Sequence, residues 1–293
     1  MSTKLAGTNI AELQNVMKFC GSRYVLNRLS FQVPQGRIVG LLGRNGAGKT
    51  TLIECLLGIR DIDHGDIRVF GDSPDSFSES SKAEIGYVPQ QTDLFEWMTA
   101  DEMLGFVSVY YPRWNQAKVD ALLDRWSVAR NVRIGRLSFG EKQRLAIIRA
   151  LAHEPSLLVL DEPVSALDPA ARRDFLRELI NVTAERSTTV LFSTHIMSDL
   201  ERVALDVAIL HNGSISLQGG LDELMTEIAR VTGSDAALQP YLANAITKPI
   251  RASGDLGQMS VLVRGLDRLP INAAKDVRVE SLTAEDLFIE VTR

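Results

Sequence analysis

Cysteine is scarce in this chain of 293 residues, which contains only Cys20 and Cys55. Two cysteines in unrelated segments exclude a small fold stapled by disulfides, and they favour a reducing compartment such as the cytoplasm. Long hydrophobic runs are also missing, because stretches such as Ile38–Leu42 and Leu157–Leu160 have the length of a buried strand, not of a membrane span. The first residues, Met1–Gln14, are mostly polar and lack the apolar core of a secretory signal. Any membrane role is therefore expected to come from a partner.

An excess of positive charge is absent as well. The chain has 32 Lys and Arg against 37 Asp and Glu, which gives a net charge of -5 and a pI near 5.5. Its surface as a whole does not attract nucleic acid, and we expect no nucleic-acid partner. Hydrophobic residues at 45% and charged residues at 24% are ordinary for globular proteins and exclude a disordered or collagen-like chain. The length predicts an enzyme-sized α/β domain with residues to spare.

Short apolar stretches along the chain predict buried strands. The first, Arg37–Leu42, is followed by a glycine-rich loop and then by a helix over Thr51–Ile59 with one apolar face. Further strands are expected at Ile85–Val88, Leu157–Leu160, Thr189–Ser193 and Val207–Leu210. Because helical stretches separate these strands, the sequence predicts a doubly wound α/β fold with a mainly parallel sheet.

Two further regions stand outside this alternating pattern. Residues 99–151 read as helical and predict an inserted helical subdomain, in which Thr99 and Glu102 have the spacing of a capping box. Beyond Gly220 an amphipathic segment gives way to short strand-like and helical pieces near Met259–Val263 and Leu282–Val291. We expect this tail to be a small appended module.

A phosphate-binding motif follows the first predicted strand. The pattern G-x-x-x-x-G-K-[ST] is filled by Gly43, Arg44, Asn45, Gly46, Ala47, Gly48, Lys49 and Thr50, and Thr51 comes next on the helix. Backbone N–H groups of such a loop cradle phosphates, Lys49 reaches the β- and γ-oxygens, and Thr50 is expected to bind Mg²⁺. A plain tight turn would explain the glycines but not the Lys-Thr pair.

Two carboxylates end the apolar strand at residues 157–160. In an open α/β sheet this end of a strand faces the ligand crevice, so Asp161 and Glu162 are expected near the phosphates. Asp161 is predicted to hold Mg²⁺, directly or through water. Glu162 is placed to deprotonate the attacking water as a general base. The alternative is a solvated strand end without a catalytic role.

These motifs and four others resemble the nucleotide-binding subunit of ATP-binding cassette (ABC) transporters over about residues 12–220. The other matches are the signature at Leu137–Glu141, the Q-loop residue Gln90, the D-loop at Ser165–Asp168 and the switch histidine His195. The resemblance implies a P-loop NTPase (RecA-like) core with an antiparallel β edge. It places the RecA-like lobe at about 10–90 and 155–220, the helical subdomain at about 91–154 and an accessory extension at 221–293.

The resemblance also implies the partners and the roles of the matched residues. In this family two cassettes close head to tail on two ATP molecules, as a homodimer or a cassette heterodimer, and drive integral membrane permease subunits from the cytoplasmic face. Each signature, here Ser138, Gly140 and Glu141, then serves the partner's nucleotide. His195 would contact the γ-phosphate, and Gln90 would touch Mg²⁺ or the attacking water. Asp168 would cross the dimer axis, although it and Pro169 also make an ordinary helix start.

The signature departs from the family's usual Leu-Ser-Gly-Gly-Gln. Ser138 and Glu141 keep the spacing of a capping box, so Ser138 is expected to cap a helix whose N-terminus points at the partner's γ-phosphate. Gly140 allows the backbone to approach phosphate, whereas Phe139 adds bulk that fills a groove or loosens the closed dimer. Capping alone is the purely structural interpretation.

Aromatic residues suggest two contact sites. Phe19 is the best candidate to stack on adenine, with Cys20 as a competing alignment and Tyr24 as a third choice, although Phe19 also suits the core of an edge strand. Six aromatics gather within twenty residues after Gln90: Phe95, Trp97, Phe106, Tyr110, Tyr111 and Trp114. Some are expected in the core of the helical subdomain, and others are expected to line a groove for a helix of the membrane partner.

The function predicted from these features is that of an ATPase subunit that powers transport, with export favoured. The alternative is a soluble cassette ATPase acting on another macromolecule, although a single cassette without long heptads counts against it. A P-loop GTPase or kinase would leave the signature unexplained, and a degenerate nucleotide sensor would not need Glu162 and His195. The substrate, the direction of transport and the role of the tail do not follow from the sequence.

Overall fold

The structure is a computed structural model that describes residues 8–164, 167–203, 206–247, 250–251, 258–265 and 277–293. The predicted D-loop residues Ser165 and Ala166 lie outside the described residues. Within the described ranges, no helix has both the length and the apolar character needed to cross a membrane.

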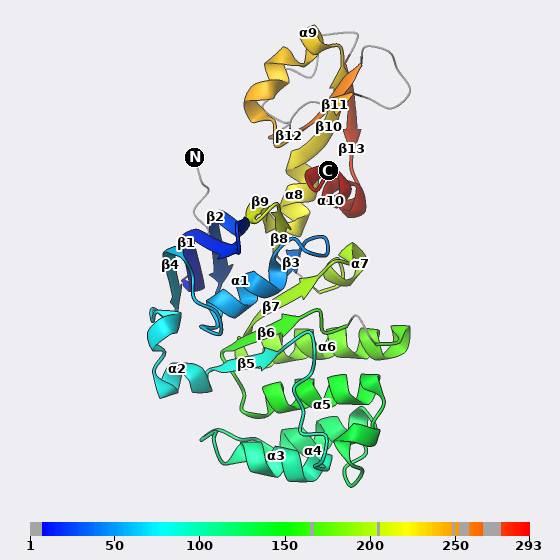
Figure 1. Cartoon of the computed structure of the whole chain (residues 1–293). Coiled ribbons are helices and arrows are strands. Elements are labelled where there is room, and N and C mark those ends of the chain that lie inside the picture. The colour runs from blue at the N-terminus through cyan, green and yellow to red at the C-terminus, as the bar shows by residue number, and fades with distance from the viewer. Residues whose placement is uncertain (1–7, 165–166, 204–205, 248–249, 252–257, 266–276) are drawn as a thin grey trace.

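A six-stranded sheet forms the centre of the molecule (Figure 1). Its strands follow the spatial order β5 (Ile85–Val88), β6 (Leu157–Asp161), β7 (Thr189–Thr194), β3 (Ile38–Leu42), β8 (Asp206–His211) and β9 (Ser214–Gly220). The first five are parallel, and β9 pairs with β8 in the antiparallel direction. The predicted parallel sheet is therefore confirmed, and each predicted strand lies within one residue of the observed one at either end.

A three-stranded antiparallel sheet stands beside the central sheet. It consists of β1 (Asn9–Cys20), β2 (Arg23–Pro34) and β4 (His64–Val69), in the order β2-β1-β4. Its buried side chains share one hydrophobic cluster with helix α1 (Lys49–Leu56) and with one face of β3. The antiparallel edge that the resemblance implied is therefore present, and it packs against the helix that follows the phosphate loop.

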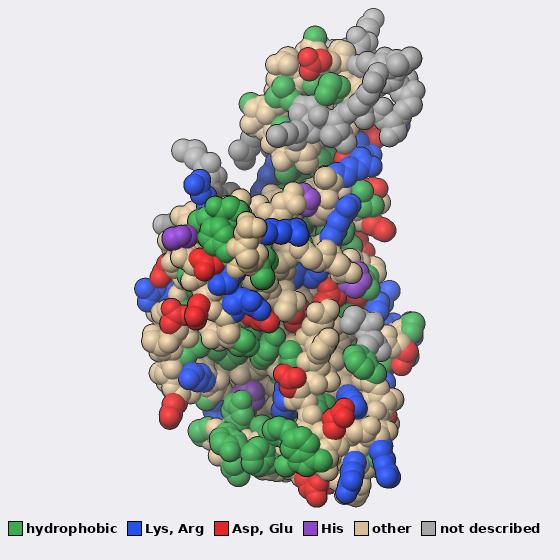
Figure 2. All heavy atoms as spheres, viewed as in Figure 1, with side chains coloured by type: hydrophobic (Ala, Val, Ile, Leu, Met, Phe, Trp, Pro, Cys, Tyr) green, Lys and Arg blue, Asp and Glu red, His purple; other side chains and the backbone are tan. Residues whose placement is uncertain are grey.

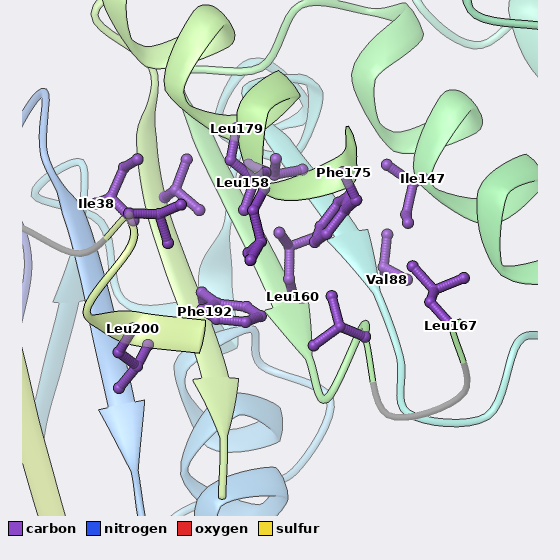
Figure 3. Packing of buried hydrophobic residues seen from close by; sticks show 14 of the residues in the cluster. Ile38, Val88, Ile147, Leu158, Leu160, Leu167, Phe175, Leu179, Phe192 and Leu200 are labelled. Carbon is purple, nitrogen blue, oxygen red and sulfur yellow. The ribbon is translucent and has the colours of Figure 1, made fainter. Parts of the chain in front are cut away.

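The largest hydrophobic cluster lies on the other face of the sheet. Figure 3 shows Leu158, Leu160 and Phe192 from the sheet against Ile147 and Phe175 from two covering helices. These are α5 (Phe139–Ala152) and α6 (Pro169–Arg186). Strands β6 and β7 are buried along their whole length, because helices cover the sheet on both faces.

Helices are inserted between β5 and β6. They are α3 (Ala100–Ser108), α4 (Gln116–Arg125) and α5, and they form the end of the molecule opposite the tail (Figure 1). The Thr99–Glu102 capping box is confirmed: the Thr99 hydroxyl accepts from the Glu102 amide at 3.2 Å, and the Glu102 carboxylate accepts from the Thr99 amide at 2.8 Å. The short helix α2 (Glu79–Ala83) precedes β5.

The tail after β9 contains a second antiparallel sheet with its own small core. Its strands are β11 (Ile250–Arg251), β12 (Met259–Arg264), β10 (Ile228–Gly233) and β13 (Arg278–Ser281), in that spatial order. Helices α8 (Leu221–Glu227), α9 (Asp235–Leu238) and α10 (Ala284–Val291) accompany it. Val231, Tyr241 and Val263 form the core of this sheet. Helix α10 turns back toward the cassette and contacts β8 and α7 (Met197–Leu200).

Candidate functional site

Four predicted site segments meet at one edge of the central sheet. The phosphate loop follows β3, Glu162 follows β6, His195 follows β7 and Gln90 lies two residues beyond β5. These strands are neighbours in the order β5-β6-β7-β3, and all are parallel, so their carboxyl ends lie side by side. This edge is where an open α/β sheet binds its ligand. The structure therefore brings together residues that are far apart in the sequence.

The phosphate loop has the backbone geometry that its glycines allow. Gly46 and Gly48 have φ values of +78° and +107°, which residues other than glycine rarely adopt. Helix α1 begins at Lys49, directly after this turn, so the N–H groups of its first turn point toward the loop. The Lys49 ammonium group donates to the carbonyl of Gly43 at 2.8 Å, which holds the lysine across its own loop. The arrangement is suited to bind a phosphate chain.

Glu162 links the phosphate loop to the switch histidine. One carboxylate oxygen lies 3.1 Å from Lys49 Nζ, and the other lies 2.9 Å from His195 Nδ1. The side chains of Lys49 and Glu162 are both buried, whereas His195 is partly exposed. Glu162 also has a φ of +50°, a left-handed conformation that is uncommon outside glycine. The backbone turn at Glu162 thus aims a buried carboxylate between an ammonium group and an imidazole.

Asp161 is positioned by a serine that sequence reasoning had not singled out. The Ser193 hydroxyl donates to Asp161 Oδ1 at 2.5 Å and accepts from the Glu162 amide at 2.9 Å. Because β6 and β7 pair Asp161 with Ser193, the hydroxyl bridges both acidic residues. Its place two residues before His195, at the end of a predicted strand, was the only signal available. Ser193 is a positioning residue of this site.

Asp161 has the properties of a ligand for a hard cation. Its side chain is fully buried, and among the described residues Oδ2 meets no hydrogen-bond donor. Burial raises the pKa of Asp161, although the hydroxyls of Ser193 and Thr50 and the charge of Lys49 oppose this rise. A buried carboxylate oxygen beside a threonine hydroxyl fits Mg²⁺, which takes few protein ligands when phosphates supply the rest. The residues present therefore fit the expected ion.

The signature segment starts helix α5 as the sequence predicted. The Ser138 hydroxyl accepts from the Glu141 amide at 3.3 Å, and the Glu141 carboxylate accepts from the Ser138 amide at 2.9 Å and hydroxyl at 2.6 Å. These bonds lower the pKa of Glu141. A Cβ at Gly140 would make only an ordinary contact, with Leu167 Cδ2 at 4.0 Å, and the Phe139 ring is 56% exposed. The capping prediction is confirmed, and Phe139 points its bulk outward from the cassette.

Asp168 and Gln90 lie at the margin of the site. The Asp168 carboxylate accepts from the amides of Ala170 and Ala171 at 2.9 and 3.0 Å, which caps α6 and lowers the pKa of Asp168. Pro169 is the first helical residue, as predicted. Gln90 is exposed at the end of β5. Both residues are accessible to a ligand or to a partner chain.

A cavity of about 630 Å³ adjoins the outer part of the phosphate loop, from Arg44 to Ala47. Cys20 and Tyr24 belong to its wall, and the Tyr24 side chain is 49% exposed. Phe19 instead packs its ring against Tyr24, with the centroids 4.4 Å apart, and its amide donates to Asp63 at 2.6 Å. The structure therefore places the two alternative residues at the cavity, and Phe19 contacts Tyr24 without being part of the wall.

The six clustered aromatics divide between a core and a surface. Trp97, Phe106 and Tyr110 are exposed and form the aromatic patch, which Phe95 supports from beneath with ring centroids 5.2 Å from Trp97 and 5.8 Å from Phe106. Side chains of this kind gather at the lower end of Figure 2, around α3. Tyr111 stacks on His153 and Trp114 packs against the main hydrophobic cluster.

Comparison with known proteins agrees with this geometry. The pattern of the family described as ABC transporter matches residues 26–165. The chain is 39% identical to an uncharacterized ABC transporter ATP-binding protein of Bacillus subtilis, over 72% of this chain and 71% of that one. It is 32% identical to Nod factor export ATP-binding protein I of Bradyrhizobium diazoefficiens, over 96% and 95%. A solved ATP-binding subunit of an ABC transporter superposes with a TM-score of 0.67 at 30% identity, over 74% of this chain and 92% of that one. This chain therefore belongs to the ABC transporter family as an ATP-binding subunit and is an ABC-type ATPase.

Proposed function

We propose that this ATPase closes as a head-to-tail dimer on two magnesium-bound ATP molecules and thereby powers export through membrane-spanning partner subunits. The observation that carries the proposal is the buried Lys49–Glu162 pair, which His195 contacts from its partly exposed position, beside an oxygen of Asp161 that has no hydrogen-bond partner among the described residues. A similar protein supports the direction of transport, since its name is Nod factor export ATP-binding protein I, and another is named for bacitracin transport.

The chain's residues divide the work of hydrolysis. Lys49 binds the β- and γ-phosphate oxygens, and its move toward them frees Glu162 to accept a proton from the attacking water. His195, which already holds the other carboxylate oxygen, donates to the γ-phosphate. Asp161 and Thr50 hold Mg²⁺, with Gln90 touching the ion or the water. The ion supplies charge neutralisation to the phosphates when bound.

The dimer completes each site with groups from the other subunit. The N-terminus of α5, with Ser138, Gly140 and Glu141, faces the partner's γ-phosphate, where the positive end of the helix stabilises negative charge. Asp168 lies across the axis and couples the two sites. A homodimer of this chain is the simplest such assembly. A heterodimer with a related cassette as the second subunit would form the two sites in the same way.

The adenine ring is assigned to Tyr24 in place of Phe19. Tyr24 offers an exposed ring in the cavity beside the phosphate loop, and the Phe19 ring packs against it. Aromatic faces pair well with planar heterocycles, so this stacking holds the nucleotide without restricting its phosphates. Gly43–Thr51 contact the phosphate chain from the opposite side.

The aromatic patch is the proposed docking site for the membrane partner. An exposed tryptophan, phenylalanine and tyrosine on one surface are typical of interface anchors. The subunit is then held at the cytoplasmic face of the membrane.

In this scheme residues 10–220 form the cassette, with the RecA-like lobe at about 10–90 and 155–220 and the helical subdomain at about 91–154. Residues 221–293 form the accessory extension.

The Lys49→Ala variant tests the nucleotide site. Removing the ammonium group takes away a charge-assisted contact to phosphate, and we expect Mg-ATP affinity to fall by at least tenfold, or about 1.4 kcal/mol. Titration calorimetry measures the affinity. Lys82→Ala, an exposed change on α2, is the matched control and should bind normally. Tight ATP binding by Lys49→Ala would contradict the assignment.

A further inference from the structure

The end of the C-terminal extension forms part of the cavity beside the phosphate loop. The wall contains Tyr24 from β2, the loop residues Arg44–Ala47 and, from the far end of the sequence, Thr292 and Arg293. The extension is thus not confined to the separate lobe that carries its sheet. It returns to the nucleotide side of the cassette through α10.

Helix α10 is held firmly in this position. Leu287 and Val291 are buried in the main hydrophobic cluster, which also contains Leu200 of α7. A capping box fixes the helix start, because the Thr283 hydroxyl accepts from the Asp286 amide at 3.1 Å and donates to the Asp286 carboxylate at 2.7 Å. The residues that follow α10 are therefore delivered to a defined place.

An ion-pair chain orients Arg293 at the cavity. Its guanidinium donates to Glu290 at 3.1 Å, and the same Glu290 oxygen lies 3.0 Å from the guanidinium of Arg230 on β10. The Glu290 side chain is 9% exposed, whereas that of Arg293 is 52% exposed. Arg293 is therefore anchored at one side and open to a ligand at the other.

The cavity has the charge and the surfaces of a nucleotide site. Arg23, Arg44 and Arg293 line it, and no Asp or Glu side chain of the described residues does. Lys49 and Glu162, which mark the γ-phosphate end, are not part of this wall. The cavity therefore takes the other end of the nucleotide, the adenosine with its first phosphate. A guanidinium binds there by stacking on the base or by donating to ribose and phosphate oxygens.

We propose that Arg293 of the C-terminal extension contacts the adenosine end of the bound nucleotide, so that the extension forms one wall of the ATP site. This inference rests on the proposed nucleotide binding at the phosphate loop. It gives the extension a direct role in nucleotide affinity, and Glu290 positions the arginine for that contact.

The test is nucleotide binding by the full chain carrying Arg293→Ala. We expect Mg-ATP and Mg-ADP to bind about 3- to 30-fold more weakly by titration calorimetry, and equally for both, because the adenosine end is common to them. Arg278→Ala is the matched control, since Arg278 is an exposed tail arginine that pairs with Glu280 and lies outside the cavity wall. It should bind as the unmodified chain does.

The possible results separate this inference from the proposed function. Binding by Arg293→Ala within twofold of the control, while Lys49→Ala loses binding, overturns the role of Arg293 alone. Absence of ATP binding by the unmodified chain overturns the proposed function itself. If Arg293→Ala lowers the melting temperature without nucleotide, Arg293→Gln replaces it, because glutamine keeps the Cβ–Cδ part of the side chain without the guanidinium. The same 3- to 30-fold criterion then applies.

Discussion

Replacing Glu162 by glutamine isolates the charge that the account assigns to the general base. The amide has nearly the same shape and keeps one acceptor, so it can still meet Lys49 or His195 but cannot take a proton from water. A positioned general base contributes about 10²- to 10⁴-fold, and we expect turnover to fall by that factor. ATP affinity should persist, because Lys49 and the phosphate loop are unchanged.

The structure also predicts the effect of this substitution on stability. Glu162 and Lys49 form a buried pair at 3.1 Å, and removal of one buried partner typically costs about 3–5 kcal/mol. Here Lys49 keeps its bond to the Gly43 carbonyl at 2.8 Å and the amide oxygen remains, so about 1–2 kcal/mol is a better expectation. That corresponds to a melting temperature lower by roughly 2–8 °C without nucleotide. Bound ATP should remove most of the deficit, because phosphate replaces the lost charge beside Lys49.

Two measurements on the same samples decide this prediction. Phosphate release gives the turnover, and thermal denaturation with and without Mg-ATP gives the stability. Glu223→Gln, an exposed change on α8, is the matched control and should alter neither. Turnover close to that of the unmodified chain would refute the role of Glu162 as the base. An equal stability deficit with and without ATP would refute the exchange of partners at Lys49.

Two other substitutions test the metal ligand and the aromatic patch. Burial raises the pKa of Asp161 in the folded chain above its value in the unfolded chain, which is near 4. Ionisation of Asp161 therefore destabilises the fold at pH values above about 4 and has no effect below that pH. Asp161→Asn should therefore stabilise the nucleotide-free chain at pH 7, with the gain vanishing below pH 4, while magnesium-dependent hydrolysis is lost. A less stable variant at pH 7 in thermal denaturation would contradict this. The Trp97 side chain is 68% exposed, so Trp97→Ala should leave the ATPase rate of the isolated chain within about twofold. It should reduce transport in membranes at least tenfold, because loss of one interface anchor costs about 1.4 kcal/mol or more of binding free energy. Ile180→Ala, 43% exposed on α6, is its control, and unchanged transport by the Trp97 variant would remove the patch as the docking site.

Local sequence patterns predicted the cassette well, because its signals are short in range. Glycines with a Lys-Thr pair between a strand and a helix define the phosphate loop by themselves, and capping spacings fixed the starts of α3 and α5 at Thr99 and Ser138. Apolar runs ending in a charged or polar residue located the carboxyl ends of β6 and β7. The parallel order of strands then brought Glu162 and His195 together.

The remaining features depend on contacts between distant segments. Ser193 bridges Asp161 and Glu162 only because β6 and β7 pair in one particular register, which no local pattern specifies. Tyr24 lines the cavity and Phe19 does not, although the two residues pair across the β1-β2 hairpin, and this depends on how the hairpin lies against the phosphate loop. In the tail, local patterns indicated the strand-like piece near Met259–Val263 and the helical piece near Leu282–Val291, but not the pairing of β12 with β10 or the return of α10 to the cassette.

The mass of the Glu162→Gln variant in solution tests the central claim most directly. Light scattering with saturating Mg-ATP should show two chains of 32.3 kDa in one particle, and a single chain when ATP or magnesium is withheld. Slow hydrolysis in this variant keeps ATP bound for the length of the experiment. A particle of one chain at saturating Mg-ATP would contradict the shared site.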